Sequence, residues 1–260
     1  MATVRMGFLI DESRCIGCRS CQVACKEWNR LVPDKTVQRG SYENPPDLTP
    51  NLYNRIKFIE KDDGNGGVKW LFRNERCLHC GDAGCMKVCP APGALYRTRE
   101  GIVAFNREKC IGCHYCVSAC PFDVPRYDES KKVTKCHLCL NRVEGGLEPA
   151  CAKACPTDTL QFGPRSALIA RAKAGGKKIY GEHDLGGLGV VYALQDPPET
   201  YGLPADPKIP ASIFLWKDII RPLGILGFWG SVAAVFVHYV TFGPRKLEEE
   251  SGEKGGSAHD

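Results

Sequence analysis

The sequence predicts an α+β protein of two nested modules followed by a single transmembrane helix, and three observations support this fold class. Sixteen cysteines fall into four groups within residues 15–155. Residues 55–72 and 93–106 each contain two β-prone runs around a turn, which is typical of a hairpin. Residues 223–242 carry no formal charge, and as a helix rising about 1.5 Å per residue they are long enough to cross a bilayer.

The four cysteine groups are related by their spacing. Groups one and three both read C-x2-C-x2-C-x3-C, and their surroundings, DESRCIGCRSC and NREKCIGCHYC, indicate an internal duplication. Group two has the spacing C-x2-C-x4-C-x3-C-P, and group four has C-x2-C-x11-C-x3-C-P. In chain order the groups are Cys15, Cys18, Cys21 and Cys25; Cys77, Cys80, Cys85 and Cys89; Cys110, Cys113, Cys116 and Cys120; and Cys136, Cys139, Cys151 and Cys155.

This spacing points to iron–sulfur chemistry. In bacterial two-cluster ferredoxins the run C-x2-C-x2-C-x3-C-P gives three thiolates to one [4Fe-4S] cluster and the fourth to the other cluster of the pair. The short gaps let one tight loop bring three sulfurs to one cluster. Because four groups are present, the sequence predicts two ferredoxin-like modules that bind four [4Fe-4S] clusters.

Group four is expected to pair with group one, and this outer pair encloses the pair formed by groups two and three. Residues 1–194 then form the four-cluster domain, with the second module, about 73–130, nested inside the first. Pairing group one with two and group three with four is the competing arrangement, and spacing alone does not exclude it. The expected ligand sets are Cys15, Cys18, Cys21 and Cys155 (set 1); Cys25, Cys136, Cys139 and Cys151 (set 2); Cys77, Cys80, Cys85 and Cys120 (set 3); and Cys89, Cys110, Cys113 and Cys116 (set 4).

Two other uses of cysteine fit the sequence less well. Zinc would explain group four alone, since two cysteine pairs around a loop are typical of a four-thiolate zinc site, but it would not explain the runs of groups one and three. Disulfides suit exported proteins, but cysteines two residues apart are poorly placed to pair with each other. Three histidines inside the groups, His79, His114 and His137, are expected to pack or to tune a cluster rather than ligate, because each group already supplies four thiolates.

The charge balance and the remaining residues exclude other function classes. The formal net charge of +5 counts every cysteine as neutral, and four thiolate-bound clusters would bring it to about −3. The sequence has no Lys/Arg cluster interleaved with aromatic residues, so no nucleic-acid partner is predicted. It also offers no general base beside a nucleophile, so no catalytic residue is predicted in this chain.

The C-terminal part of the sequence predicts a membrane anchor. A short helix is expected over about 166–174, and the Pro-rich segment 195–212 is expected to be an extended linker. Residues 213–243 should form the membrane approach and the span, with the transmembrane helix at 222–243. The tail, 244–260, is charged and Gly-rich, and we expect it to be disordered.

In this order the four groups resemble the electron-transfer subunits of the molybdopterin oxidoreductase family, and more closely the iron–sulfur (beta) subunit of membrane-bound respiratory formate dehydrogenase. The resemblance runs nearly end to end. It rests on the stretches CIGCRSCQVACKEWN, SYENPPDL, CMKVCPAPGA, GIVAFNREKCIGC, EPACAKACPT and YGLPADPKI, the last followed by the span. The stretch YGLPADPKI and the span that follows it separate this subgroup from its soluble relatives.

The resemblance implies the nested ligand sets, with set 1 towards a catalytic subunit and set 4 towards the membrane. Some relatives replace one group-three cysteine with tryptophan and hold a three-iron cluster there. Cys113 is present here, so four [4Fe-4S] clusters are expected.

The resemblance also implies partners and a location. A molybdopterin catalytic (alpha) subunit containing molybdenum or tungsten would oxidise formate to CO2. Electrons would then pass through this chain to b-type haem in a membrane cytochrome b (gamma) subunit and to quinone. The chain would be a single-pass protein of the cytoplasmic membrane, in contact with lipid, with its cluster domain on the periplasmic side. The N-terminus has no signal segment or twin arginine, which fits export together with a partner and equally fits a cluster domain that faces the cytoplasm. The positive charges on the two sides of the span are nearly balanced, so they leave the orientation open.

Three points stay open at this stage. The same subunit could serve another molybdopterin reductase or a hydrogenase, or the chain could be a zinc-stabilised, membrane-anchored interaction module without redox function. His238 lies in the span near its far end, where we expect it to contact a partner or a lipid headgroup, with haem ligation as the alternative.

Overall fold

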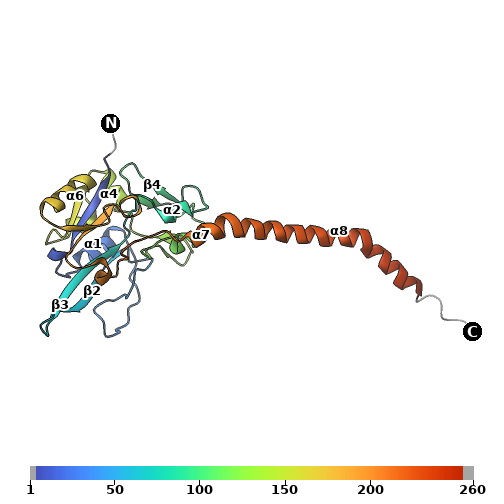
Figure 1. The fold of residues 1–260 in the computed structure, drawn as a ribbon, viewed down its shortest axis with the longest axis horizontal. Coiled ribbons are helices and arrows are strands. Elements are labelled where there is room, and N and C mark those ends of the chain that lie inside the picture. Colours follow the sequence, from blue (N-terminus) through green and yellow to red (C-terminus); the bar gives the residue numbers. More distant parts are fainter. Residues whose placement is uncertain (1–3, 254–260) are drawn as a thin grey trace, which may run out of the picture. The chain divides into compact units, whose positions relative to one another are not determined.

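The computed structural model describes residues 4–253, with side chains up to residue 243. The chain divides into two compact units, Met1–Pro210 and Ala211–Asp260, which are described separately. The first unit mixes small sheets with short helices, and the second is helical (Figure 1). The α+β class with one long C-terminal helix is therefore confirmed.

A four-stranded sheet with the order β8-β1-β10-β9 organises the first unit. The N-terminal strand β1 pairs in parallel with β10 and antiparallel with β8, while β9 pairs antiparallel with β10. Strands from both ends of this unit thus lie side by side. Their bounds are Met6–Asp11 for β1, Leu160–Pro164 for β8, Lys178–Tyr180 for β9 and Val190–Leu194 for β10.

The two faces of this sheet have different neighbours, because successive side chains of a strand point to opposite faces. Leu9 packs with Leu168 of helix α6 (Arg165–Ala174), which confirms the helix predicted near this position. Phe8 and Ile10 are fully buried in the main core, which also contains cysteines of groups one, two and four. The sheet therefore separates ordinary apolar packing from the cysteine-rich core.

The cysteine groups lie on short helices and on the loops before them. The two repeated groups share one backbone conformation: Gly17 and Gly112 have φ of 67° and 71°, and Arg19 and His114 have φ of 62° and 63°. Glycine adopts this left-handed region at little cost, which explains its place in both CIGC motifs. The helices are α1 Ser20–Trp28, α2 Gly84–Lys87, α3 Tyr115–Ser118, α4 Leu140–Glu144 and α5 Ala150–Lys153, with 3-10 helices η1 Glu12–Arg14 and η2 Asp184–Gly186.

Both predicted hairpins are confirmed, and a third is present. The first pairs β2 with β3, the second pairs β4 with β5, and the third pairs β6 with β7. The third was not predicted because two residues per strand are too few for a periodic pattern. The strands are β2 Asn54–Asp62, β3 Val68–Arg76, β4 Leu95–Arg97, β5 Val103–Phe105, β6 Arg126–Tyr127 and β7 Val133–Thr134.

The loop of cysteine group two is attached to the sheet by backbone hydrogen bonds. The N–H of Val190 donates to the carbonyl oxygen of Leu78 at 3.0 Å, and the N–H of Gly189 donates to that of His79 at 3.1 Å. Strand β10 therefore holds the first loop of the inner pair of groups against the core of the outer pair.

The segment 195–212, expected as an extended linker, is packed on the core over part of its length. Pro198–Tyr201 forms the 3-10 helix η3, and the side chains of Tyr201 and Leu203 are buried. These two apolar side chains explain the difference, because burying them removes from water a surface that an extended linker would expose.

The second unit is one nearly continuous helix. Helix α7 (Ala211–Leu215) continues through a π-helical turn (Trp216–Ile220) into α8 (Arg221–Glu253). Within the described part of the chain, Ala211–Gly243 is the one helix long and apolar enough to cross a membrane. This finding agrees with the span predicted at 222–243.

The predicted end of this helix was wrong. A disordered tail was expected over 244–260, but α8 continues to Glu253. The sequence KLEEE that follows the span consists of good helix formers, which favours continuation of the helix. Residues 254–260 lie outside the described residues.

Candidate metal-cluster sites

All sixteen cysteines lie among the residues that the structure describes, and none of them forms a disulfide. Cys18 is exposed, whereas the others are buried or half-buried. Free thiols in these positions are available as ligands, which fits the predicted use of cysteine better than the disulfide alternative.

The four thiols of set 1 line one cavity, although one of them comes from the far end of the cysteine-bearing region. Burial raises the pKa of Cys15 to about 12, and the charges of Cys155 and Cys18 are among the further causes. The structure thus brings the first three cysteines of group one together with the last cysteine of group four.

Two kinds of hydrogen-bond donor face the sulfurs of set 1. The side-chain amide of Asn74 donates from Nδ2 to Sγ of Cys21 at 3.4 Å. Burial acts to raise the pKa of Cys155, but the backbone N–H groups of Leu160 and Thr157 outweigh it and lower that pKa. Donors of this kind stabilise a thiolate and tune a bound cluster.

Set 2 gathers around Cys25, which lies on helix α1. Burial raises the pKa of Cys25 well above its usual value, and the charges of Cys136, Cys151 and Cys139 raise it further. These three thiols all belong to group four, so the structure places the fourth cysteine of group one beside the first three of group four.

Arg76, the last residue of β3, contacts the sulfurs of set 2. Its guanidinium donates to Sγ of Cys151 at 3.3 Å and to Sγ of Cys136 at 3.1 Å. Burial alone would lower the pKa of Arg76, but Cys136 and Cys151 outweigh it and hold the pKa above its usual value. Arg76 is therefore a permanent cation against sulfur.

The four thiols of set 3 line a second cavity, together with His79 and Lys135. Burial raises the pKa of Cys80, and the charges of Cys77, Cys120 and Cys85 raise it further. The structure thus brings three cysteines of group two together with the last cysteine of group three.

Set 4 reverses the contributions of the two inner groups, with three cysteines from group three and the last cysteine of group two. Burial raises the pKa of Cys116 to about 12, and the charges of Cys113 and Cys89 are further causes. The hydroxyl of Tyr127 lies 2.8 Å from Sγ of Cys116. Burial also raises the pKa of Tyr127, with Cys116, Cys110 and Cys113 as further causes.

The four sets adjoin one another in series. Cys151 of set 2 acts on the pKa of Cys21 of set 1, and Cys85 of set 3 acts on that of Cys116 of set 4. Between sets 2 and 3 lies Lys135, whose Nζ donates to the carbonyl oxygen of Cys136 at 3.1 Å. The same Nζ lies 3.7 Å from Sγ of Cys77.

The donors present fit iron–sulfur clusters. Each set consists of four soft thiols on short helices and the loops before them, and N–H, O–H or cationic donors face the sulfurs, as expected for [4Fe-4S] ligands. A mononuclear zinc site needs four ligands at about 2.3 Å from one point. In the described part of the chain no three His, Cys, Asp or Glu side chains are placed to hold a single metal ion.

The three histidines inside the groups contact neighbouring residues, and Nε2 of His137 lies 2.8 Å from Oδ1 of Asn29. Nδ1 of His79 accepts the N–H of Val103 at 3.1 Å, and burial lowers the pKa of His79. The ring of His114 stacks on Tyr127 with 3.8 Å between centroids. His238 is exposed on α8, and its ring lies 5.3 Å from that of Phe242.

Several residues that touch the sulfurs were missed by the sequence analysis, among them Arg76, Lys135, Asn74 and Tyr127. One signal exists for two of them, because a basic residue precedes the first cysteine of every group. This signal is ambiguous, since the other two such residues, Arg14 and Lys109, are exposed.

Family models match most of the chain. Two models described as 4Fe-4S dicluster domains match residues 68–165 and 14–94. A third, described as the transmembrane part of formate dehydrogenase N, matches residues 209–251. The predicted combination of cluster modules and one membrane helix is therefore confirmed.

Curated relatives resemble the chain over nearly its whole length. The iron–sulfur subunit of nitrate-inducible formate dehydrogenase from Escherichia coli is 43% identical over 94% of this chain and 88% of the relative. The formate dehydrogenase iron–sulfur subunit of Haemophilus influenzae is 42% identical over 95% and 83%. A polypeptide of the anaerobic dimethyl sulfoxide reductase from Escherichia coli is 38% identical over 64% and 77%.

Proposed function

Since this protein belongs to the family of formate dehydrogenase iron–sulfur subunits, we propose that it relays electrons from a formate-oxidising molybdopterin subunit to a membrane cytochrome b and quinone. The observation that carries this proposal is the serial arrangement of the four thiol sets. When bound, [4Fe-4S] clusters supply one-electron redox centres. The chain's own residues hold them in order and tune them through donors to sulfur.

The proposal includes the nested ligand sets given above, with four clusters in all. Their support is the identity of the thiols that act on each cysteine. The thiols that act on Cys25 come from group four rather than from group two. The thiols that act on Cys120 are Cys85 and Cys77 of group two. The competing arrangement, with group one paired to group two, has no such support.

We assign set 1 to the side of the molybdopterin partner and set 4 to the side of the membrane partner. Each terminal set has an exposed apolar side chain in its CIGC motif: Ile16 is 61% exposed and Ile111 is 65% exposed. Covering these side chains in an interface would remove apolar surface from water beside a terminal cluster. The proposed location is the cytoplasmic membrane, with the cluster domain on the periplasmic side.

His238 is proposed to contact the membrane partner or a lipid headgroup. It is exposed on α8, within the segment matched by the transmembrane family model. Polar side chains at this depth usually meet a partner or an interface, because an unsatisfied polar group in hydrocarbon is costly.

The test is the iron, acid-labile sulfide and zinc content of the anaerobically purified complex. Four clusters require about sixteen iron and sixteen sulfide per chain. About four zinc without sulfide would overturn the proposal and leave a membrane-anchored binding module.

The ligand sets are tested by EPR: Cys25→Ser and Cys151→Ser should alter one signal, and Cys15→Ser and Cys155→Ser another. If Cys25→Ser instead alters the same signal as Cys77→Ser, the nested pairing is wrong.

A second candidate is the same role beside another molybdopterin reductase. The dimethyl sulfoxide reductase polypeptide favours it at 38% identity, but that match covers 64% of this chain. The family model at 209–251 favours formate dehydrogenase. The identity of the large subunit that co-purifies with this chain decides between them.

A further inference from the structure

We propose that Arg76 and Lys135 are positioning residues that cross between the two modules and raise the reduction potentials of the two central clusters. The inference rests on the proposed function, since it takes sets 2 and 3 as cluster ligands. It goes further in assigning the electrostatic control of the central step to two residues of this chain.

Arg76 begins in the inner pair of groups and reaches the outer one. It directly precedes Cys77 of group two, yet its guanidinium donates to two sulfurs of group four at 3.1 and 3.3 Å. The side chain is buried, with Arg76 2% exposed, and the guanidinium lies 4.5 Å from the centre of the Phe8 ring. The ring and the two sulfurs together hold the planar cation in one place.

Lys135 extends in the opposite direction, from the outer pair of groups to the inner pair. It directly precedes Cys136 of group four, yet its Nζ lies 3.7 Å from Sγ of Cys77 in group two. The residue is 3% exposed, and its Nζ also donates to the carbonyl oxygens of Val103 and Cys136. The ammonium group is thus fixed between sets 2 and 3.

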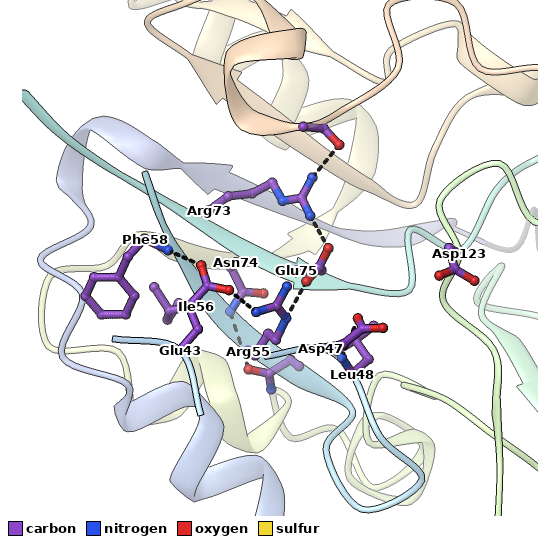
Figure 2. Close-up of polar contacts among 12 residues, drawn as sticks. Glu43, Asp47, Leu48, Arg55, Ile56, Phe58, Arg73, Asn74, Glu75 and Asp123 are labelled. Atoms are coloured by element: carbon purple, nitrogen blue, oxygen red, sulfur yellow. Dashed lines mark hydrogen bonds and ion pairs between the residues drawn. The ribbon is translucent and has the colours of Figure 1, made fainter. Parts of the chain in front are cut away.

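Neither cation is neutralised by a carboxylate, in contrast to other buried arginines nearby. Figure 2 shows Arg55 and Arg73 of the β2–β3 hairpin, each of them beside a glutamate. Within the described residues no carboxylate forms an ion pair with Arg76 or Lys135. A buried charge without a counter-charge is costly, so the compensating negative charge must come from the sulfur sets.

A bound cluster supplies that negative charge. A [4Fe-4S] core with four thiolates carries a net charge of about −2 when oxidised and about −3 when reduced. A nearby buried cation stabilises the more negative state more strongly, because Coulomb energy is little screened in the interior. Each cation therefore favours reduction of the central clusters.

The sequence supplies a matched comparison at the two terminal groups. Arg14 and Lys109 hold the same position, directly before the first cysteine of groups one and three, but both are exposed. Arg14 lies 3.8 Å from Asp158, and its side chain is 45% exposed. Solvent screens such charges, so the effect is confined to sets 2 and 3.

The electron transfer concerned moves one electron between neighbouring clusters, so that one is oxidised as the other is reduced. No bond is made or broken in this step. With raised reduction potentials, the two central clusters would be reduced more easily than the terminal ones. An electron passing along the series would then reside mainly on the central clusters.

The experiment is a redox titration followed by EPR on the anaerobically purified complex, with iron and sulfide counted for every variant. The variants are Arg76→Gln and Lys135→Gln, with Arg76→Lys as the variant that keeps the charge. Arg14→Gln and Lys109→Gln are the controls at the equivalent exposed positions.

With iron at the parental level, we expect each of the two buried Gln variants to move the midpoint of one or both central signals downward. The expected size is a tenfold change in the reduction equilibrium, which is about 59 mV for one electron. Arg76→Lys should keep most of the parental potential, and the two controls should not move any signal.

Unchanged midpoints in both Gln variants with full iron content would overturn the inference. If Arg76→Gln alone loses iron, the midpoints of Lys135→Gln decide in the same way. Loss of iron from both variants would also overturn it, since the residues would then hold clusters rather than set potentials. Failure of the proposed function is distinguishable, because the parental complex itself would then lack iron and sulfide.

Discussion

The basic residue in front of the first cysteine has opposite surroundings in the two kinds of group. In the repeated groups it ends a 3-10 helix or lies in a turn: Arg14 is the last residue of η1, Lys109 lies in a turn, and both are exposed. In groups two and four it stands at the end of a strand or directly after one, as Arg76 ends β3 and Lys135 follows β7. A strand that runs into the core carries its last side chain inward. The element before the first cysteine therefore decides whether the basic residue that precedes this cysteine is buried or exposed.

The same division appears in the donors to sulfur. The terminal sets receive neutral donors from side chains, the amide of Asn74 at Cys21 and the hydroxyl of Tyr127 at Cys116. The central sets receive the cations Arg76 and Lys135 in addition to a neutral donor, the side-chain amide of Asn29 at Cys25. Neutral donors polarise a sulfur without adding charge, whereas a buried cation acts on a cluster's total charge. The interior of the series and its ends are therefore built differently.

The largest expected effect on stability comes from removing the Phe8 ring, which packs against the guanidinium of Arg76. Phe8 is fully buried, its ring lies under the guanidinium, and it also packs on Phe162 with 5.3 Å between centroids. Phe8→Ala should lower the free energy of unfolding by about 4 kcal/mol, because a large cavity remains. The measurement is thermal unfolding of the purified complex, followed by loss of cluster absorbance.

Val68→Ala is the control for this variant, because Val68 is 60% exposed on the β2–β3 hairpin. It should change the free energy of unfolding by no more than about 0.5 kcal/mol. Equal losses in the two variants would contradict the view that the sheet face carrying Phe8 supports the cluster core.

A smaller effect is expected where the sheet meets the loop of group two. A Cβ atom on Gly7 would lie 2.4 Å from the carbonyl oxygen of Gly189, whose N–H is bonded to His79. Gly7→Ala should therefore cost about 2 kcal/mol, because backbone must shift to admit the methyl group. The melting experiment used for Phe8→Ala measures it.

Gly163 provides an internal control, since it pairs directly with Gly7 in the same ladder. A Cβ there would meet nothing within 4 Å. Gly163→Ala should leave stability unchanged within about 0.5 kcal/mol or raise it slightly. If the two substitutions cost the same, strand pairing rather than the close approach to Gly189 governs this edge.

The sequence predicts the local features of the molecule well. Cysteine spacing, the two longer hairpins, helix α6 and the membrane helix depend on patterns within a few residues of one another. The four-stranded sheet was not predicted, because β1 finds its partners β8 and β10 near the other end of the unit. Short strands with distant partners leave no periodic signal of their own.

The chemistry of the sites is predicted unevenly for the same reason. The ligand type follows from spacing, since thiols at C-x2-C-x2-C have few other uses. The roles of Arg76 and Lys135 depend on burial and on sulfurs about sixty residues away. Nothing in the dipeptides Arg-Cys and Lys-Cys distinguishes these residues from the exposed Arg14 and Lys109, so only the fold separates them.

The smallest expected effect concerns lysine side chains that form ion pairs with a carboxylate. Asp196 accepts from Lys61 of β2 and Lys69 of β3, whose side chains are 41% and 42% exposed. Lys61 and Lys69 hold the pKa of Asp196 below its usual range. A lowered folded-state pKa gives stability that is present above the usual Asp pKa of about 4 and is lost as pH falls through the lower folded value.

Asp196→Asn should therefore lower stability at pH 7 by about 0.5 kcal/mol, as is typical of exposed ion pairs. The difference from the parent, measured as a shift in melting midpoint, should shrink at high salt and below about pH 4. The potential shift expected for Arg76→Gln should persist at high salt, because that cation is buried against sulfur. If both effects vanish together at high salt, the distinction between screened surface cations and buried cluster cations fails.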